Sequence, residues 1–362
     1  MPELQKLGYI KNHTWRSRRV AGGYGPVGSD VMSRIILVIG ITFLAFIFTG
    51  LAAWYARRSG MVDRPGERHS HAVVTPRGGG IGIILALFVA STLFTGSGGE
   101  IWVHCVLPGL LVLALLGWWD DHASLSARLR FFVQLAVSIY LVACAINNGW
   151  IQGVGSIFLA VLFLVWMTNL YNFMDGSNGL AGLQGVFGGA VLFGLFDSAG
   201  QPDLALASAC VAASCAGFLP WNLGSARVFM GDVGSISLGF VFGALLVIGV
   251  GNQAFSLPVA LLVMLVFITD STLTLIGRIL KREQWYNAHK QHLYQRLIAR
   301  GWTHGGVALL YQAINLALVV PGIVVAVNYP ALAWVVAMIL ILVFTIGWYQ
   351  LIKRNGVLAQ AG

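Results

Sequence analysis

The sequence predicts an all-α, polytopic membrane protein. Of its 362 residues, 57% are hydrophobic and only 10% are charged, and the mean hydropathy is +0.80. Soluble domains carry about 25% charged residues, so this composition is far from the soluble norm. Apolar runs long enough to cross roughly 30 Å of hydrocarbon recur along the chain, separated by short polar segments.

Eleven apolar runs are predicted to be transmembrane helices. They cover residues 33–56, 79–95, 101–118, 130–147, 153–170, 180–197, 203–220, 234–250, 256–279, 306–328 and 330–352. Several runs are short and rich in glycine, so one of them could re-enter the membrane without crossing it. Because no repeat or low-complexity segment divides the chain, we expect residues 32–362 to form a single membrane domain.

Lysine and arginine residues predict how the array is oriented. Apart from six near the N-terminus, they fall in or beside the breaks after odd-numbered runs, or in the C-terminal tail. By the positive-inside rule, odd-numbered spans end in the cytoplasm, and so does the C-terminus. The basic residues 1–31 would then lie on the wrong side. We therefore hypothesise that Met32 is the true start and that residues 1–31 are an upstream extension.

Polar side chains are concentrated on this predicted cytoplasmic face, whereas the outer breaks hold only a few acids and amides. The cytoplasmic segments are "DRPGERHSHAVVTPRGGG" at 63–80, "DDHASLSARLR" at 120–130, "TNLYNFMDGSNGLAG" at 168–182, "WNLGSARVFMGDVGS" at 221–235 and "KREQWYNAHKQHLYQRL" at 281–297. We expect these five segments to line a single site at the membrane surface.

Two of the segments contain candidate metal ligands, each with a structural alternative. Asn169, Asn172 and Asp175 are spaced three apart and would form a polar stripe on a helix end. The alternative is a helix end that is merely satisfied by amides. Asp232 stands between two glycines, which allow a ligand to approach closely, and its carboxylate suits Mg²⁺. The alternative for Asp232 is a helix N-cap.

Asp120 and Asp121 are adjacent carboxylates at the end of an apolar run. Because such groups repel each other, we expect a cationic partner, either a metal or the nearby Arg128 and Arg130. The alternative is a solvated surface pair.

The histidines of the last segment, His289 and His292, are three residues apart in a basic stretch. Taken alone, they indicate a wet basic helix more than a metal site, because no third ligand is near them in sequence.

Taken together, the five segments indicate a particular kind of chemistry. Carboxylates suit a divalent cation, arginines fit phosphate oxygens, and amides can read a base or a sugar. Such a set suits a phosphorylated, water-soluble substrate that meets a membrane-embedded one. A reaction between two anions needs metal and arginine to offset their repulsion and the charge of the leaving group.

The motifs "PRGGG", "DDHASLSAR", "NLYNFMDGSNGLAG", "VFMGDVGS" and "AHKQHLYQRL" also carry a family resemblance. In this order, the chain resembles the polyprenyl-phosphate N-acetylhexosamine-1-phosphate transferases, of glycosyltransferase family 4 type, from about residue 33 to 350. Within that superfamily it looks most like the branch that starts O-antigen synthesis with N-acetylfucosamine or N-acetylquinovosamine 1-phosphate. "DGSNG" departs from the common D-G-x-D-G, and the last loop lacks a run of consecutive histidines.

The resemblance implies a reaction at the cytoplasmic face of the bacterial inner membrane. Undecaprenyl phosphate would attack the β-phosphorus of a UDP-N-acetylaminosugar and release UMP, with Mg²⁺ or Mn²⁺ required. The product would initiate O-antigen, lipopolysaccharide or a related cell-envelope glycan. The bilayer is an implied partner, nucleic acid is not, and a homodimer remains open.

The resemblance also assigns roles to the motif residues. Asp232 would be the main metal ligand, with Asn172 as a second. Of Asp120 and Asp121, one would act on the lipid phosphate and the other would support the metal and pyrophosphate. The remaining candidates would bind substrate: Asn169, Asp175 and Asn178 along the nucleotide, Arg128, Arg130 and Arg227 at phosphates, and His289 and His292 on the sugar side.

An ion-coupled transporter is the alternative from another functional class. It rests on Asp270, which is predicted near the middle of the ninth span, with Arg278 about two turns further along roughly the same face. Charges inside a membrane often mark transport pathways. Transporters, however, usually hold their substrate near the bilayer midplane, whereas the polar groups here are predicted at one surface.

Overall fold

The computed structural model describes residues 27–63, 74–94, 96–284 and 289–358. The proposed extension at 1–31 therefore falls largely outside the described residues. The chain divides into two units, residues 1–36 and 37–362, and the structure of the second is described below. Two-residue strands β1 (Val62–Asp63) and β2 (Thr75–Pro76) pair antiparallel, and they flank the segment 64–73.

The rest of the described chain is built from helices, as the composition predicts. Their bounds are α1 (Val27–Ser59), α2 (Ile81–Ser91), α3 (Ser97–Ile101), the π-helix η1 (Trp102–Val106), α4 (Leu107–His122), α5 (Ala127–Asn147), α6 (Val154–Met174), α7 (Leu180–Ser198), α8 (Pro202–Asn222), α9 (Gly231–Gly251), α10 (Leu257–Val263), α11 (Leu265–Leu280), α12 (Leu293–Ile298), α13 (His304–Ile314), the π-helix η2 (Asn315–Val319), α14 (Val320–Asn328), the 3₁₀ turn η3 (Pro330–Leu332) and α15 (Ala333–Leu358).

The number of membrane spans differs from the eleven that the sequence predicts. Among the described residues, nine helices are long and apolar enough to cross, or ten if α10 and α11 form one broken span with an 83° bend. The run predicted at 79–95 yields only α2, an apolar helix of 11 residues. At 1.5 Å per residue, α2 is about 16 Å long, roughly half the hydrocarbon thickness.

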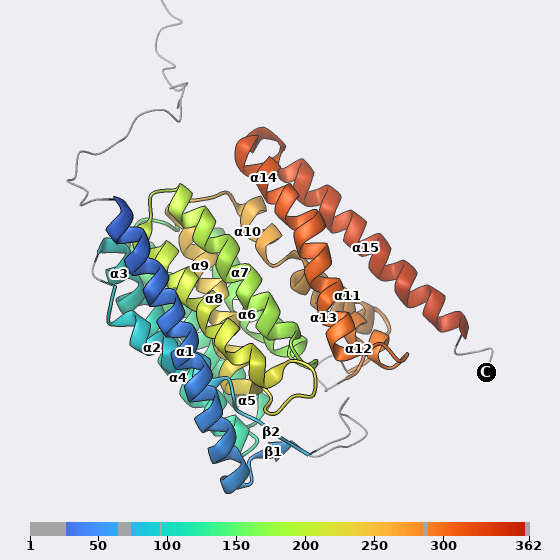
Figure 1. Ribbon diagram of the computed structural model, residues 1–362. Coiled ribbons are helices and arrows are strands. Elements are labelled where there is room, and N and C mark those ends of the chain that lie inside the picture. The colour runs from blue at the N-terminus through green and yellow to red at the C-terminus, as the bar shows by residue number, and fades with distance from the viewer. Residues whose placement is uncertain (1–26, 64–73, 95, 285–288, 359–362) are drawn as a thin grey trace, which may run out of the picture. The chain divides into compact units, whose positions relative to one another are not determined.

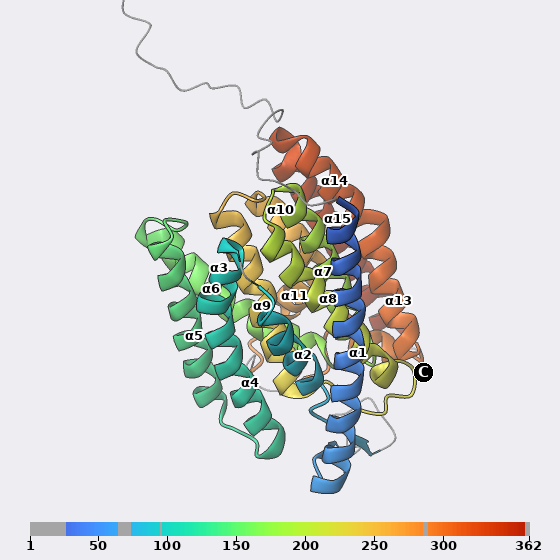
Figure 2. The same ribbon diagram turned by 60° about the vertical axis from the view of Figure 1, so that its left-hand side comes forward.

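The central helix of the array is α9, which packs against α2, α4 and α6. Of the spans in the described residues, it is the most buried, because 89% of its most apolar stretch is enclosed by other parts of the protein. Helices α13, α14 and α15 lie together at one side of the array (Figures 1 and 2), where α13 contacts α7 and α15 contacts α10 and α11.

Glycines allow the site end of α9 to lie close to its neighbours. A Cβ on Gly117 of α4 would come within 2.6 Å of the Asp232 carbonyl group, and a Cβ on Gly80 would overlap Gly234. In a membrane, where burial gives little drive for helix association, such close contacts supply the packing energy. They hold Asp232 directly against the end of α4 that carries the two adjacent aspartates.

Candidate active site

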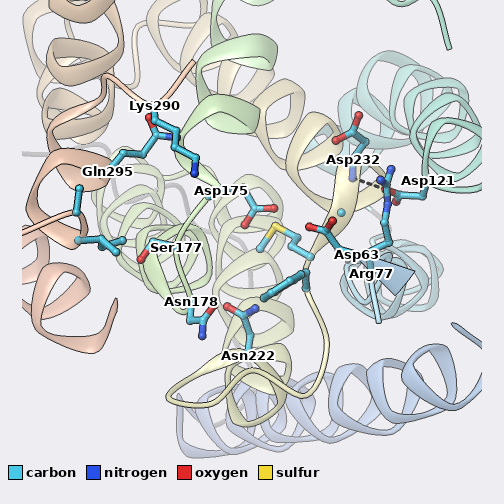
Figure 3. A pocket seen from close by; sticks show the side chains of 16 residues that line it. Asp63, Arg77, Asp121, Asp175, Ser177, Asn178, Asn222, Asp232, Lys290 and Gln295 are labelled. Atoms are coloured by element: carbon cyan, nitrogen blue, oxygen red, sulfur yellow. Dashed lines mark hydrogen bonds and ion pairs between the residues drawn. The ribbon is translucent and has the colours of Figure 1, made fainter. Parts of the chain in front are cut away.

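A cavity of about 590 Å³ opens at the end of the array where α4, α6 and α8 finish and α9 begins (Figure 3). It is lined by Asp63, Arg77, Asp121, Asp175, Gly176, Ser177, Asn178, Asn222, Phe229, Met230, Gly231, Asp232, Lys290, Gln295, Ile298 and Ala299. All five polar segments contribute to this lining, as expected. Four carboxylates and two cationic side chains face it among the described residues.

Asp121 joins three parts of the chain. Its Oδ1 accepts from Arg77 Nε at 3.0 Å and from the Asp232 amide at 3.0 Å, while its Oδ2 accepts from the Val233 amide at 3.1 Å. An ion pair of 2.8 Å with Arg77 Nη2 adds to these contacts. Asp121 therefore caps the N-terminus of α9, whose amides favour a carboxylate. The fully buried Asp121 side chain fixes α9 to α4 and to the segment after β2.

Asp120 has a separate set of partners. Its Oδ1 accepts from the Leu125 amide, and its Oδ2 accepts from Arg130 Nη1 at 2.8 Å. The same Nη1 donates to Asp232 Oδ2 at 3.1 Å. Both aspartates are only 5% exposed, so they are not the solvated surface pair considered as an alternative. Arg130, one of the two expected arginines, pairs with Asp120, whereas the partner of Asp121 is Arg77 and not Arg128.

Asp232 lies in the first turn of α9, and its carboxylate does not cap its own helix. The N-cap alternative is therefore wrong. Asn172 Nδ2 donates to Asp232 Oδ1 at 2.9 Å and to Ser235 Oγ at 2.8 Å. The Asp232 side chain keeps 21% exposure and lines the cavity. The structure thus brings together the two predicted metal ligands.

Asp175 follows α6 and lies between the two sides of the cavity in Figure 3. Burial raises the pKa of this half-buried carboxyl well above its usual range, and the charges of Asp232 and Asp121 raise it further. When it is protonated, this carboxyl can donate a hydrogen bond to an oxygen of a ligand. Asn178 also lines the cavity, and its Nδ2 donates to the Gly224 carbonyl at 2.8 Å.

The two histidines do not line this cavity among the described residues. His292 is 3% exposed and stacks on the rings of Phe173 and Tyr294, so the wet-helix alternative does not hold for it. Burial lowers its pKa. Burial and the neighbouring His292 lower the pKa of His289 to about 4, which leaves both rings neutral at pH 7.

Three other predicted substrate residues also lie away from the cavity. Asn169 Nδ2 donates to Gln134 Oε1 at 2.7 Å and to the Val165 carbonyl, so its amide is engaged within the helix layer. Arg128 is exposed, and the exposed Arg227 lies over the Trp221 ring at 5.9 Å. Arg130, by contrast, lies beside the cavity through its contact with Asp232.

Arg77 and Asn222 were not singled out from the sequence. Arg77 immediately precedes three glycines in "PRGGG", which was the available signal. Asn222 accepts from the Gly179 amide at 2.7 Å and donates to the Val228 carbonyl at 3.0 Å. Asn222 thereby connects the loop that carries Asp175 to the loop that precedes Asp232. In the sequence, the only signal for Asn222 was an amide at the very end of an apolar run.

The donor set fits a hard divalent cation that is shared with a substrate. No group of three His, Cys, Asp or Glu side chains converges on a common point within the part of the chain that the structure describes. Among the described lining residues, carboxyl groups nevertheless outnumber cationic side chains, and the Asp232 side chain is partly exposed. Mg²⁺ is commonly held by one or two carboxylates, with substrate phosphates and water completing its shell.

Comparison with known proteins identifies relatives over most of the chain. The model of the family "Glycosyl transferase family 4" matches residues 103–250. A probable undecaprenyl-phosphate N-acetylglucosaminyl 1-phosphate transferase of Bacillus subtilis is 31% identical over 306 residues, which cover 81% of this chain and 85% of the relative. A decaprenyl-phosphate N-acetylglucosaminephosphotransferase of Mycobacterium tuberculosis is 30% identical, covering 80% and 83%. An undecaprenyl-phosphate alpha-N-acetylglucosaminyl 1-phosphate transferase of Escherichia coli O157:H7 is 26% identical, covering 85% and 89%.

The helical array, its polar cavity and these relatives define a multi-pass membrane enzyme that transfers phospho-sugars to polyprenyl phosphate. The chain belongs to glycosyl transferase family 4, within the polyprenyl-phosphate N-acetylhexosamine-1-phosphate transferase superfamily.

Proposed function

We propose that this enzyme transfers an N-acetylaminosugar 1-phosphate from a UDP-sugar to undecaprenyl phosphate. The lipid phosphate oxygen attacks the β-phosphorus, the bond between that phosphorus and the bridging oxygen breaks, and UMP leaves with the oxygen. The observation that carries the proposal is the convergence of Asp121, Asp175, Asp232, Arg77 and Lys290 on one cavity at the ends of the apolar helices. Its volume of about 590 Å³ lies within the usual range for small-molecule sites, about 300–1,000 Å³.

The hydrogen bonds divide the roles of the two adjacent aspartates. Asp121 holds α9 and Arg77 with both oxygens, so it acts as a positioning residue. Asp120 shares Arg130 with Asp232, and a phosphate can compete for this guanidinium. We assign Asp120, which lies beside the cavity, to the lipid phosphate, where it orients Arg130 toward that phosphate. Arg130 then stabilises charge on the phosphoryl oxygens.

Residues on the opposite side of the cavity fit the donor. In Figure 3, Lys290 and Gln295 lie across the cavity from Arg77 and Asp121, with Asp175 between them. Lys290 provides a cation for a diphosphate, and Asp175 is placed to hydrogen-bond the nucleotide. Asp232 and Asn172 would hold Mg²⁺, which when bound offsets charge on the diphosphate and on the leaving UMP.

The identity of the sugar and the side of the membrane that the cavity faces are inferred from the sequence motifs and the charge distribution. "DRPGERHSHAVVTPRGGG" and the HxxHxYQ loop favour N-acetylfucosamine or N-acetylquinovosamine and a role in starting O-antigen synthesis, whereas the named relatives act with N-acetylglucosamine. The charge distribution favours a cytoplasmic cavity and C-terminus in the bacterial inner membrane.

A panel assay tests the function. Purified protein in detergent is mixed with undecaprenyl phosphate, Mg²⁺ and each of UDP-N-acetylglucosamine, UDP-N-acetylquinovosamine and UDP-N-acetylfucosamine, and UMP release is measured. We expect release with at least one donor, only when lipid phosphate is present. Failure with every donor would contradict the proposal.

A substitution of Asp232 tests its assignment as a metal ligand. Asp232→Ala should lower kcat at least 100-fold while the protein stays folded, because a carboxylate that binds metal has no substitute in alanine. Ser198→Ala, at the far end of α7, is a control that should keep normal turnover. Normal activity and metal dependence in Asp232→Ala would remove Asp232 from the metal site.

A further inference from the structure

Asp270, the buried acid of α11, has no role in the proposed function. Its side chain is completely buried. Oδ1 accepts from the Leu293 amide at 2.9 Å, from Trp348 Nε1 at 2.9 Å and from Thr274 Oγ1 at 3.3 Å. Oδ2 accepts from Tyr311 Oη at 2.7 Å. One carboxylate thus joins α11 to α12, α13 and α15.

The contact with Leu293 connects Asp270 to the cavity. Leu293 begins α12, and the following turn carries Gln295, Ile298 and Ala299, which line the cavity. Because an amide in the first turn of a helix has no partner within that helix, the Asp270 carboxylate fixes where α12 begins and how it is oriented. Without this acceptor, the Leu293 amide would be left buried and unsatisfied.

A second contact extends this connection to the opposite loop. Tyr294 Oη donates to the Phe173 carbonyl at 2.9 Å, at the end of α6. The Tyr294 hydroxyl group also lies against Gly176, where any Cβ would collide with it. Gly176 follows Asp175 directly, so α12 also holds the loop that carries Asp175. The path from Asp270 to the cavity therefore runs through two adjacent residues, Leu293 and Tyr294.

We propose that Asp270 is a positioning residue for the donor side of the reaction, which it serves by fixing α12 against α13 and α15. Asp270 itself does not touch a substrate. The inference rests on the proposed function in one respect, namely that the UDP-sugar occupies the cavity wall built by α12. Acceptor binding at Asp120 and Arg130, on α4 and α5, should be independent of Asp270. This assignment also explains the buried charge without any transport pathway.

The test uses three variants of the full-length protein and two matched controls. Asp270→Asn removes the charge, Tyr311→Phe removes one hydrogen-bond donor and keeps the ring, and Trp348→Phe removes one donor and replaces the indole with the smaller phenyl ring. Trp102→Phe and Tyr140→Phe make the same chemical changes at the other end of α4 and α5, where the partners are Ser91 Oγ and the His104 carbonyl. These controls report the cost of losing one such hydrogen bond far from the cavity.

We expect the variants to change KM for the UDP-sugar and not KM for the lipid. Trp348→Phe and Tyr311→Phe should raise KM for the UDP-sugar about three- to tenfold, and Asp270→Asn should raise it more, because hydrogen bonds to a charged group are lost. KM for undecaprenyl phosphate should stay within about twofold. The controls should change neither constant.

Hydrogen exchange gives a readout that does not depend on activity. In all three variants the Leu293 amide and residues 289–299 should exchange faster than in the parent and the controls. The inference is overturned if donor KM and Leu293 exchange are unchanged, or if donor and acceptor KM rise equally. If Asp270→Asn does not fold, the two conservative variants decide. If the parent protein releases no UMP, the proposed function fails, while hydrogen exchange still tests how Asp270 holds α12.

Discussion

Arg130 donates from a single nitrogen, Nη1, to carboxylates on two helices, Asp120 of α4 and Asp232 of α9. Its side chain keeps 33% exposure, whereas Asp120 keeps 6%. A guanidinium has five donor hydrogens in a fixed plane, so Arg130 can bind a phosphate while it keeps a hydrogen bond to at least one of the two carboxylates. We expect Arg130 to move between these partners as the reaction proceeds.

The two adjacent aspartates should differ in what their amide variants lose. Asp121→Asn should lower turnover at least 100-fold and also cost about 3 kcal/mol of unfolding free energy, because Arg77 and two amides of α9 lose a buried anion. Asp120→Asn should lower turnover as much but cost much less stability, since Arg130 keeps Asp232 as a partner. Turnover is measured as UMP release, and stability by thermal unfolding in detergent.

Glu100→Gln, in α3, is a suitable control for this pair because it makes the same chemical change at an exposed residue. It should leave both quantities unchanged. Equal unfolding midpoints for Asp120→Asn and Asp121→Asn would contradict the division of roles.

The partners of these aspartates show which contacts a sequence can predict. Arg130 is in the same segment as Asp120, so their pairing could be expected from spacing. Arg77 is 44 residues from Asp121, and the Asp232 amide is 111 residues away. Pairing over such distances depends on how the helices pack, and the capping of α9 by a carboxylate from another helix left no local pattern.

The ninth predicted span shows a similar limit at the level of helices. Residues 256–279 read as one apolar run, yet α10 and α11 meet at an 83° bend around Met264. No proline or glycine marks this break. Its contacts come from α7, where Gln184 Nε2 donates to the Val263 carbonyl at 3.4 Å and lies 3.5 Å from the Met264 sulfur. Sequence predicts apolar length well, but the partner of a carbonyl at this break is an amide from a helix 79 residues away in the chain.

The crossing of α4 and α9 should tolerate no added side chain. Gly117→Ala would place a methyl group within 2.6 Å of the Asp232 carbonyl group and the Val233 Cα. Because these are backbone atoms, the N-terminus of α9 must shift, and the hydrogen bonds that the Asp232 and Val233 amides donate to Asp121 lengthen. We expect a loss of at least tenfold in kcat and about 1–3 kcal/mol in unfolding free energy.

Gly277→Ala is a matched control within α11, where an added Cβ meets nothing within 4 Å. Alanine there should stabilise the helix by up to about 1 kcal/mol and leave kcat unchanged. Similar behaviour of the two alanine variants would contradict the close-contact argument.

For the whole molecule, the five polar segments converge at one end of the array, as predicted from the distribution of charges and motifs along the chain. The distribution of lysine and arginine predicts that this end faces the cytoplasm. Ser225→Cys, in the loop between α8 and α9, should therefore resist a membrane-impermeant maleimide in intact cells and react after permeabilisation. Ser198→Cys, at the opposite end of α7, should react in both conditions. The four native cysteines are buried or half-buried, so they should add little background.

The reverse labelling pattern would contradict the predicted orientation without affecting the geometry of the cavity. If Ser225→Cys reacts in intact cells and Ser198→Cys only after permeabilisation, the cavity faces outward and a cytoplasmic nucleotide sugar cannot be the donor.

Within the described part of the chain, four acidic and two basic side chains line the cavity, and this balance affects which ligand binds. A diphosphate without a counterion would meet these carboxyl groups, and the arginine of the cavity, Arg77, is already paired with Asp121. A nucleotide complexed with a divalent counterion carries less net charge and meets less repulsion. We therefore expect the cavity to bind a diphosphate that brings its own divalent counterion more tightly than the same diphosphate without one.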